Sequence, residues 1–473
     1  MDHTDEYNTQ ARTNPVFMTA KTAVCLMARA GIADSVIIRD RLGLQDDTPL
    51  QSMADADVIL GNVLVVEAKY RTMCRLIEDS GYHVCVDLPC GYTPKALRMT
   101  EKGLRFVGLD LPIVAQEAGP ILRSLAACPE RMSFSGVDAT NYHSLEAALQ
   151  EIDEPLCIST EGMMMYFSED EADAVISNIS GLLEIHGGCW ITPDPEYRLQ
   201  FFHSFCSVFG ESAFRKLETA GNAAKRQSDV GNLCNSFILD VPDVTGSCKA
   251  AEELLKKHGL KAEKVNLAEH MPELGIYREL TSKQVSRFKE AMRLCHYWVI
   301  APDATQKHPA RAETTGQKPF RMRYTCANGL FQLSLAGRVD SISAPKILMA
   351  WDAEKTSGVI DRIKIDCSGL EYISSAGIRV LLSIRDNCKR DILFYNVSQP
   401  IAKILAQNGF TEISLSYSGS SFDIKGDEYV RALAQYFYCI PDVRLIKATG
   451  LDIIGADADA ILKAIESTMQ QAK

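Results

Sequence analysis

The stretch from Val84 to Asp110 limits the possible folds of this chain more than any other. It reads VCVDLPCGYTPKALRMTEKGLRFVGLD: an apolar segment, a turn broken by glycine and proline, a helix-forming segment and a second apolar segment ending on an acid. This order is half of a nucleotide-binding α/β unit, in which the turn lets backbone approach a cofactor and a carboxylate roughly 20 residues later binds ribose. Gly91 and Asp110 stand 19 positions apart, although the turn lacks the full run of glycines of a dinucleotide site.

Strand and helix signals alternate through the first two thirds of the chain. Apolar segments typical of strands lie at 83–88, 105–109, 132–137, 155–160, 187–192 and 295–301, with helix-forming segments between them. Strands that alternate with helices predict an α/β fold with a mostly parallel sheet, covered by helices on both faces.

A polar segment at 303–318, DATQKHPARAETTGQK, has no large apolar residue and no periodicity, which is typical of a linker. We therefore predict a first domain at 1–302. Strand signals at 329–340, 359–366 and 392–397, and a helix signal at 378–387, predict a smaller α/β domain over about 319–417. The extension at 418–473 has helix signals at 427–438 and 457–471, and we assign it no function.

Composition excludes several classes of function. The chain has 473 residues and a net charge of −11, from 50 basic and 61 acidic side chains, which opposes a broad basic surface for nucleic acid. Its 15 cysteines are scattered without a CxxC pair, which favours reduced thiols in a cytoplasmic protein and implies no metal. The amino terminus does not resemble a secretion signal, and no run of 18 apolar residues predicts a membrane span.

Acids follow three of the predicted strands. Asp110 ends one strand, Asp138 follows another in GVDAT, and Glu161 follows a third in PLCISTEGMMMYF. A single acid at a strand end is usually a turn or helix cap. Three at successive strand ends share the carboxyl edge, where open parallel sheets bind ligands.

The first domain resembles the leucine carboxyl methyltransferase family, which includes O-methyltransferases of small molecules. The resemblance covers roughly 15–302, and its motifs occur in the family's order: Arg29-Ala30 followed by IIRD, Arg71-Thr72, VDLPCGYTPKALRM, FVGLDLP, GVDATN and TEGMMMYF. It implies a Rossmann-like domain that binds S-adenosylmethionine. By this resemblance the residues that hold the cofactor are Arg71 at its carboxylate, Gly91 under its methionine portion, Asp110 at the ribose, Asp138 and Ala139 near the adenine, and Glu161 near the methionine side.

The glycine turn also departs from the family pattern. Pro89 and Cys90 stand where glycine and a small residue are usual, and Thr93 replaces a common aspartate. Proline removes a backbone N–H that could have served the cofactor. This departure favours an alternative in which the domain senses S-adenosylmethionine or its product without turnover.

The second domain resembles a STAS domain, the fold of anti-sigma-factor antagonists. The matching segments are LAGRVD at 335–340, IDCSGLEYISSAGIRVLL at 365–382 and GFTEI at 409–413. By this resemblance Ser375 matches the phosphoacceptor, Ser374 takes a position often held by an acid, and Asp340 matches an acid nearby. The free N–H groups of a helix start would accept a phosphate on Ser375, although many serines there are only caps.

The two resemblances together imply an S-adenosylmethionine-dependent O-methyltransferase, acting on a carboxylate or hydroxyl of a small molecule or protein. The STAS domain would bind a protein partner, such as a kinase or an anti-sigma-like protein. No catalytic residue is assigned, because a carboxylate acceptor is already nucleophilic. A third hypothesis is that the first domain only scaffolds the second. The acceptor itself is not identified, since its pocket would be built largely from the variable segment at about 197–267.

Overall fold

The computed structural model describes residues 16–45, 50, 55–217, 235–305, 319–356, 360–388 and 391–415. The chain divides into two compact units, Met1–Glu313 and Thr314–Lys473, which are described separately below. The helices predicted at 427–438 and 457–471 lie outside the described residues. Among the described helices, none combines the length and the apolar character needed to cross a membrane.

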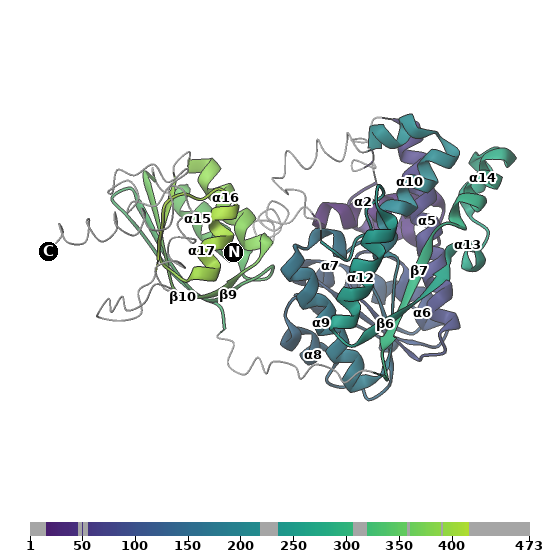
Figure 1. The fold of residues 1–473 in the computed structure, drawn as a ribbon, viewed down its shortest axis with the longest axis horizontal. Helices are drawn as coiled ribbons and strands as arrows, with labels where there is room; N and C mark the ends of the chain where they lie inside the picture. The colour runs from purple at the N-terminus through teal and green to yellow at the C-terminus, as the bar shows by residue number, and fades with distance from the viewer. Residues whose placement is uncertain are drawn as a thin grey trace. The chain divides into compact units, whose positions relative to one another are not determined.

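The first unit is built on a seven-stranded sheet in the order β3-β2-β1-β4-β5-β7-β6 (Figure 1). Its strands are β1 (Val84–Asp87), β2 (Arg105–Asp110), β3 (Met132–Gly136), β4 (Leu156–Ser159), β5 (Gly188–Thr192), β6 (Leu260–Asn266) and β7 (His296–Pro302). Strand β7 runs antiparallel to β5 and β6, and the other neighbouring pairs are parallel. The predicted α/β fold with a mostly parallel sheet is thus confirmed.

The edge strand β6 was missing from the sequence prediction. Its sequence, LKAEKVN, carries few apolar residues and most of it is exposed or half-buried, so it lacks the pattern of a covered strand. The chain then passes through short helices and returns as β7, whose His296 pairs with Asn266 at the end of β6. Because this connection begins and ends at the same edge of the sheet, β7 is antiparallel.

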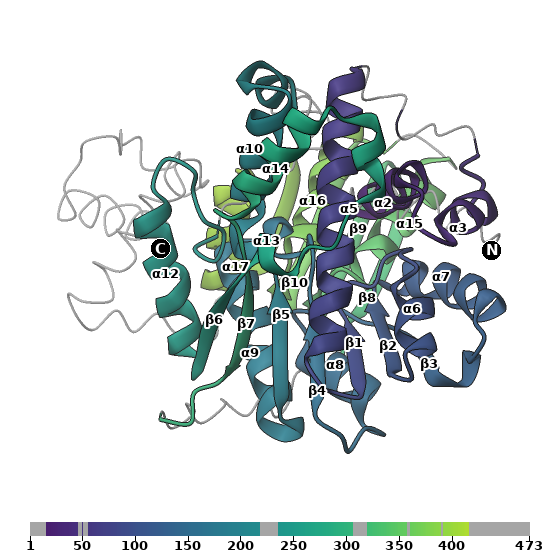
Figure 2. The same cartoon turned by 90° about the vertical axis from the view of Figure 1, so that its right-hand side faces the viewer.

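Helices cover both faces of this sheet, and each face has its own hydrophobic core. The helical elements of the unit are α2 (Val16–Ala30), α3 (Ser35–Arg41), α5 (Ala56–Asp79), α6 (Lys95–Glu101), α7 (Pro112–Leu125), η1 (Pro129–Arg131), α8 (Tyr142–Leu149), η2 (Met164–Tyr166), α9 (Glu169–His186), η3 (Asp194–Glu196), α10 (Tyr197–Val208), α12 (Val244–Lys257), α13 (Leu267–His270), η4 (Gly275–Glu279) and α14 (Ser282–Met292). Helices α5, α6 and α7 pack on the face that carries Cys85 and Phe106. Helices α8, α9 and α12 pack on the face that carries Val86 and Val107. Figure 2 shows α5 lying over one face of the sheet. Both faces of the central strands are therefore buried, which explains their nearly continuous apolar sequences.

The strand order places a switch point at the centre of the sheet. From β1 the chain moves outward to β2 and β3, and it then returns to the other side of β1 as β4. In open α/β sheets, ligands bind beyond the carboxyl ends of the strands at such a point. The residues that follow β1 and β4 are therefore the first place to look for a site.

The second unit is a five-stranded sheet in the order β12-β11-β10-β9-β8, with helices on one face (Figure 1). Its elements are β8 (Arg321–Ala327), β9 (Leu330–Val339), α15 (Ala344–Lys355), β10 (Arg362–Ile373), α16 (Ser375–Cys388), β11 (Ile392–Val397), α17 (Gln399–Gln407) and β12 (Ile413–Leu415). Strand β8 is antiparallel to β9, and the remaining pairs are parallel. β8 was also missed from sequence. Its residues alternate between polar and apolar, but RMRYTCA is short, carries few strongly apolar residues and is mostly exposed, as an edge strand can be.

Candidate functional site

The glycine turn after β1 lies against the end of β2. The Gly91 N–H donates to Asp110 Oδ2 at 2.8 Å, and the Leu111 N–H donates to Asp110 Oδ1 at 2.7 Å. Gly91 has φ of 54°, and the nearest atom to a β-carbon built there is 3.9 Å away, so its outer side is open. The structure therefore joins the two residues that the sequence analysis paired, with backbone open to a ligand.

The Asp110 carboxyl group is nearly buried, with 7% of the residue exposed. Burial, only partly offset by the hydrogen bonds from Gly91 and Leu111, raises the pKa of Asp110 to about 7. Each carboxylate oxygen has a second lone pair, so Asp110 can still accept from ligand hydroxyls when it is ionised.

Two more N–H groups of the turn are used within the sheet. The Leu88 N–H donates to the Ser159 carbonyl at 2.9 Å, and the Cys90 N–H donates to the Leu109 carbonyl at 3.0 Å. Pro89, which follows a cis peptide bond, has no N–H. These backbone donors are therefore not available to a ligand, whereas the remaining lone pairs of Asp110 are.

A buried ion pair lies beneath this turn. Lys95 Nζ is 2.7 Å from Asp87 Oδ1, and the two side chains are 3% and 1% exposed. The Ser159 hydroxyl donates to the same oxygen at 2.6 Å, whereas Asp87 Oδ2 is buried without a hydrogen-bond partner. Burial alone would lower the pKa of Lys95, but the Asp87 and Glu161 carboxylates outweigh it and hold the pKa above its ordinary value. Sequence reasoning missed this pair, although an acid at a strand end and a lysine early in the next helix were visible.

Across the switch point, Glu161 follows β4 and faces a buried lysine. Lys69 Nζ on α5 lies 3.6 Å from Glu161 Oε1, and the side chains are 6% and 21% exposed. The same ammonium lies 5.0 Å from the centre of the Tyr197 ring at the start of α10. Lys69 was not selected from the sequence, where the only signal was a charged residue inside the apolar stretch of α5.

Arg71 lies in a different network on α5. Its Nε donates to Glu67 Oε1 at 2.6 Å. The fully buried Glu67 carboxylate also accepts the N–H groups of Gly275 and Ile276, at 2.8 and 2.9 Å. The Glu67 carboxylate thus links α5 to the start of η4, and Arg71 pairs with that carboxylate. The cation beside Glu161 is Lys69 instead.

Asp138 and Ala139 form a tight turn after β3. Asp138 Oδ1 accepts from the Thr140 N–H at 2.8 Å and from the Thr140 hydroxyl at 2.6 Å. The Ala139 carbonyl accepts from Asn178 Nδ2 at 2.9 Å. These contacts order the loop at the carboxyl edge beyond β3, next to the end of β2 that carries Asp110.

Asp194 fixes the loop that carries Glu161, and it was also missed from sequence. Its fully buried carboxylate accepts three backbone N–H groups, from Gly162 at 2.6 Å, Met163 at 3.0 Å and Met164 at 2.9 Å. Because β4 and β5 are adjacent, the acid after β5 reaches the loop after β4. The position of Glu161 is thereby set by the sheet.

Helix α2 contributes a nearly buried lysine at the glycine turn. Lys21 Nζ lies 3.6 Å from Glu117 Oε2 and 5.7 Å from the centre of the Tyr92 ring. The Tyr92 hydroxyl donates to Glu117 on α7. These three side chains join α2, the turn and α7 at the carboxyl edge of the sheet.

In the second unit, the predicted phosphoacceptor Ser375 is the first residue of α16. The neighbouring Ser374 is 2% exposed, and its hydroxyl accepts the Gly377 N–H at 3.2 Å. Asp340 Oδ1 accepts the N–H groups of Ile342 and Ser343, at 3.2 and 2.9 Å, so it orders the loop after β9. Ser374 therefore caps the helix, and Ser375, the first helical residue, is half-buried.

Metal ligation has no support in the part of the chain that the structure describes. There, no group of three or more His, Cys, Asp or Glu side chains has the geometry to hold a metal ion.

Comparison with known proteins identifies a domain family in the second unit. Residues 328–416 match the family model described as Mlab, STAS domain, which confirms the predicted STAS domain. No curated protein matches the chain.

Solved structures similar to this chain include several methyltransferases. An O-methyltransferase family protein from Burkholderia thailandensis shares 14% identity over 56% of this chain and 70% of its own, with a TM-score of 0.29. A putative methyltransferase from Thermobifida fusca shares 14% identity over 60% of this chain and 93% of its own, with a TM-score of 0.34. A DUF574 family protein from Streptomyces avermitilis shares 14% identity over 59% and 96%, with a TM-score of 0.32.

Proposed function

With a STAS domain at 328–416 as the premise, we propose that the first unit is an S-adenosylmethionine-dependent O-methyltransferase and that the STAS domain binds a regulatory partner. The domain limits we propose are 1–302 and 319–417. The observation that carries the enzyme proposal is the contact between Gly91 and Asp110 at the switch point, with Lys69 and Glu161 beyond the neighbouring strand. Motifs at 86–99 and 160–167 that resemble the leucine carboxyl methyltransferase family support it.

The residues present fit this cofactor. Asp110 would accept the ribose hydroxyls, and the open side of Gly91 would let the cofactor pass close to the backbone. The Glu161 carboxylate would lie near the positive charge of the methionine portion, and Lys69 supplies a buried cation for a carboxylate. We keep Arg71 as a second candidate for that carboxylate, and Asp138 with Ala139 as the adenine side.

S-adenosylmethionine supplies an activated methyl group when it is bound. The chain's part is then to orient an acceptor in line with that group and to exclude water, so a strong base is not required. We propose a carboxylate or hydroxyl acceptor. The described part of the segment at 197–267 places Tyr197, under the Lys69 ammonium, on this side of the site.

A sensor without turnover is the second candidate, and one observation favours it. The turn's N–H groups at Leu88, Cys90 and Gly91 all have acceptors within the protein, and Pro89 has none to offer. A cofactor would then find no free backbone donor at these four positions to fix its geometry. Such a protein would bind S-adenosylmethionine or its product and signal through the STAS domain.

Calorimetric titration of the full chain with S-adenosylmethionine and with S-adenosylhomocysteine tests the proposal. We expect Asp110→Ala to weaken binding by about 1–3 kcal/mol, the cost of losing a hydrogen bond to a charged group. Asp79→Ala removes an exposed acid of α5 and is the matched control. Because the pKa of Asp110 is raised to about 7, affinity should fall as pH drops below that value, where the carboxyl group is protonated.

The outcomes separate the candidates. Binding that Asp110→Ala weakens and Asp79→Ala does not, followed by consumption of S-adenosylmethionine in an acceptor screen, would support the enzyme. Binding of the same kind without consumption with any acceptor would support the sensor. No heat from either ligand with folded protein would refute both and favour a first unit that only scaffolds the STAS domain.

For the STAS domain, we propose that Ser375 is phosphorylated by a partner kinase. Ser375 begins α16, where the positive end of the helix dipole stabilises a phosphate. A phosphate would change the local charge by nearly two units and so alter which partner binds.

A further inference from the structure

The sheet of the second unit has a basic face on the side opposite its helices. We use the term basic face for Arg321, Arg323, Arg338, Arg362 and Lys364. The strand register shows that they lie on one face, because each is on, or pairs with, one of the alternate residues 330, 332, 334, 336 and 338 of β9. Arg321 and Arg323 of β8 pair with Ala336 and Ser334. Arg362 and Lys364 of β10 pair with Leu330 and Gln332, and Arg338 of β9 pairs with Tyr372. The alternate residues of β9 and β10, such as Leu333 and Ile365, are buried under the helices. The basic face is therefore the outer surface of the sheet.

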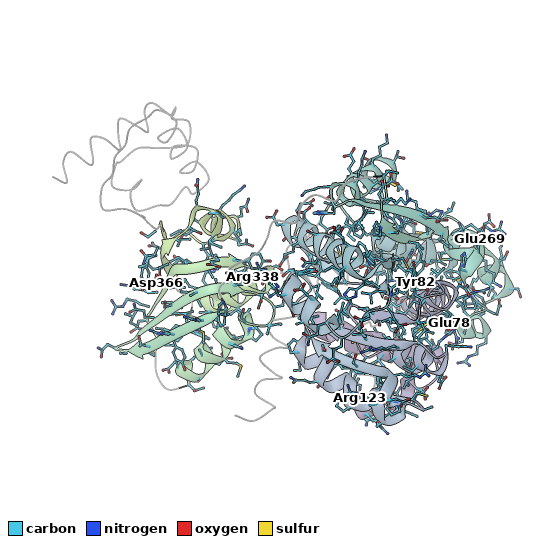
Figure 3. The ribbon with its side chains drawn as sticks, turned by 90° about the horizontal axis from the view of Figure 1, so that it is seen from below. Glu78, Tyr82, Arg123, Glu269, Arg338 and Asp366 are labelled. Atoms are coloured by element: carbon cyan, nitrogen blue, oxygen red, sulfur yellow. The ribbon has the colours of Figure 1, made fainter. Side chains whose placement is uncertain are left out.

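Few acidic side chains balance this surface: Asp366 lies on it, and Glu371 is exposed on β10 beside Tyr372. Asp366 pairs with Ser334 and so lies on the same face, where it accepts a hydrogen bond from Asn396 Nδ2 at 3.0 Å. Figure 3 labels Asp366 and Arg338 on this sheet. Among the described residues, none of the five cations makes an ion pair. A concentration of unpaired cations on one face, in a chain of net charge −11, indicates a surface for an anionic partner.

Arg338 is held in a defined orientation. Its guanidinium carbon lies 3.8 Å from the centre of the Tyr372 ring, a close cation–π stack between adjacent strands. Within the described residues, Arg338 Nε is buried and makes no hydrogen bond. Because the stacked guanidinium is already held in one orientation, it loses less entropy when its terminal N–H groups bind an acceptor.

We propose that the basic face is a docking surface for an acidic protein segment, rich in Asp and Glu side chains. Four arginines and one lysine, with Tyr372 and Tyr395 on the same face, match protein interfaces, in which Arg and Tyr are enriched and Lys is depleted. The composition of the face is that of a protein interface, and it lacks the cluster of large apolar side chains that inserts into a membrane. Ser375, at the start of α16, follows Tyr372 of this face by three residues.

Fluorescence anisotropy of the full chain with a labelled decaglutamate peptide tests the proposal. We expect salt-dependent binding that Arg321→Glu with Arg323→Glu weakens by about tenfold or more, since attraction becomes repulsion. Lys346→Glu with Lys403→Glu makes the same charge change on exposed positions of α15 and α17 and is the matched control, expected to leave binding within about twofold. Arg338→Lys keeps the charge but loses the planar donors, and we expect it to weaken binding by about threefold or more.

Several results would overturn the proposal. These are no binding of decaglutamate at low salt, equal loss in the two double variants, or no effect of Arg338→Lys. Tighter binding of a deoxythymidine oligonucleotide of equal charge would assign the face to nucleic acid instead, and tighter binding to phosphatidylglycerol vesicles would assign it to an anionic membrane. Self-association that Arg321→Glu with Arg323→Glu abolishes would identify the occupant as a second copy of the chain.

Discussion

The ion pair between Asp87 and Lys95 gives the sharpest test of how the sheet supports the candidate site. Replacing Lys95 by Met removes a cation that lies 2.7 Å from Asp87 Oδ1, at a place where neither side chain reaches water. Asp87 would keep only the Ser159 hydroxyl as a partner, and its Oδ2 atom is already without one. A buried carboxylate left in this state costs about 3–5 kcal/mol of unfolding free energy.

The double variant should cost less than the single one. In Lys95→Met with Asp87→Asn no charge is buried, and the asparagine oxygen still accepts from Ser159. We expect a loss of about 1–2 kcal/mol, so the two substitutions should be coupled by about 2 kcal/mol or more. The physical reason is that desolvation of an unpaired charge, and not the loss of attraction alone, dominates the single variant.

Urea titration of the full chain at neutral pH measures these differences, read by hydrogen exchange in peptides that cover β1 and β2. That readout follows the first unit alone, which a tryptophan signal would not, because Trp190 and Trp298 lie in the first unit and Trp351 in the second. If Lys95→Met and Asp87→Asn proved additive within about 0.5 kcal/mol, the buried pair would not be a coupled unit and the reasoning would be refuted.

Two further predictions concern other parts of the molecule. His296 donates to Glu196, which raises the pKa of His296 above its ordinary value; NMR titration should show this shift and its loss in Glu196→Gln. By linkage, the stability that this pair contributes is fully present below the pKa of His296 in the unfolded chain and is lost as pH rises through its pKa in the folded chain. A difference in unfolding free energy between wild type and Glu196→Gln that did not change with pH would contradict this prediction. For Ser375, mass spectrometry of the chain isolated from its native cells should find a phosphorylated peptide that Ser375→Ala lacks, and an unmodified peptide from every growth condition would count against it.

Local sequence was enough to predict most of the sheet and one pair of site residues. Strands buried on both faces have nearly continuous apolar sequences, and those around Val84 and Phe106 were therefore visible. The separation of Gly91 and Asp110 is fixed by one strand, one turn and one helix, so their contact followed from local order. The SSAG motif was also visible as a local pattern, although its glycine is required by packing against another strand: a β-carbon at Gly377 would lie 2.7 Å from side-chain atoms of Ile373 and of Val339 on β9.

Edge strands and distant pairs required the tertiary structure. Strands β6 and β8 carry polar residues, since their stability comes from a neighbouring strand rather than from burial on both faces. Lys69 meets Glu161 only because α5 crosses the sheet beside β4.

The sequence by itself determined the α/β class, the turn with its carboxylate and the STAS domain, because each depends on residues close along the chain. Tertiary structure decided that Lys69 lies beside Glu161 while Arg71 pairs with Glu67, although the two cations are neighbours on one helix. It also decided that Asp194 holds the Glu161 loop and that five cations share one face of the second sheet. These arrangements depend on which helix face and which strand edge meet after packing, and residue spacing along the chain does not contain that information.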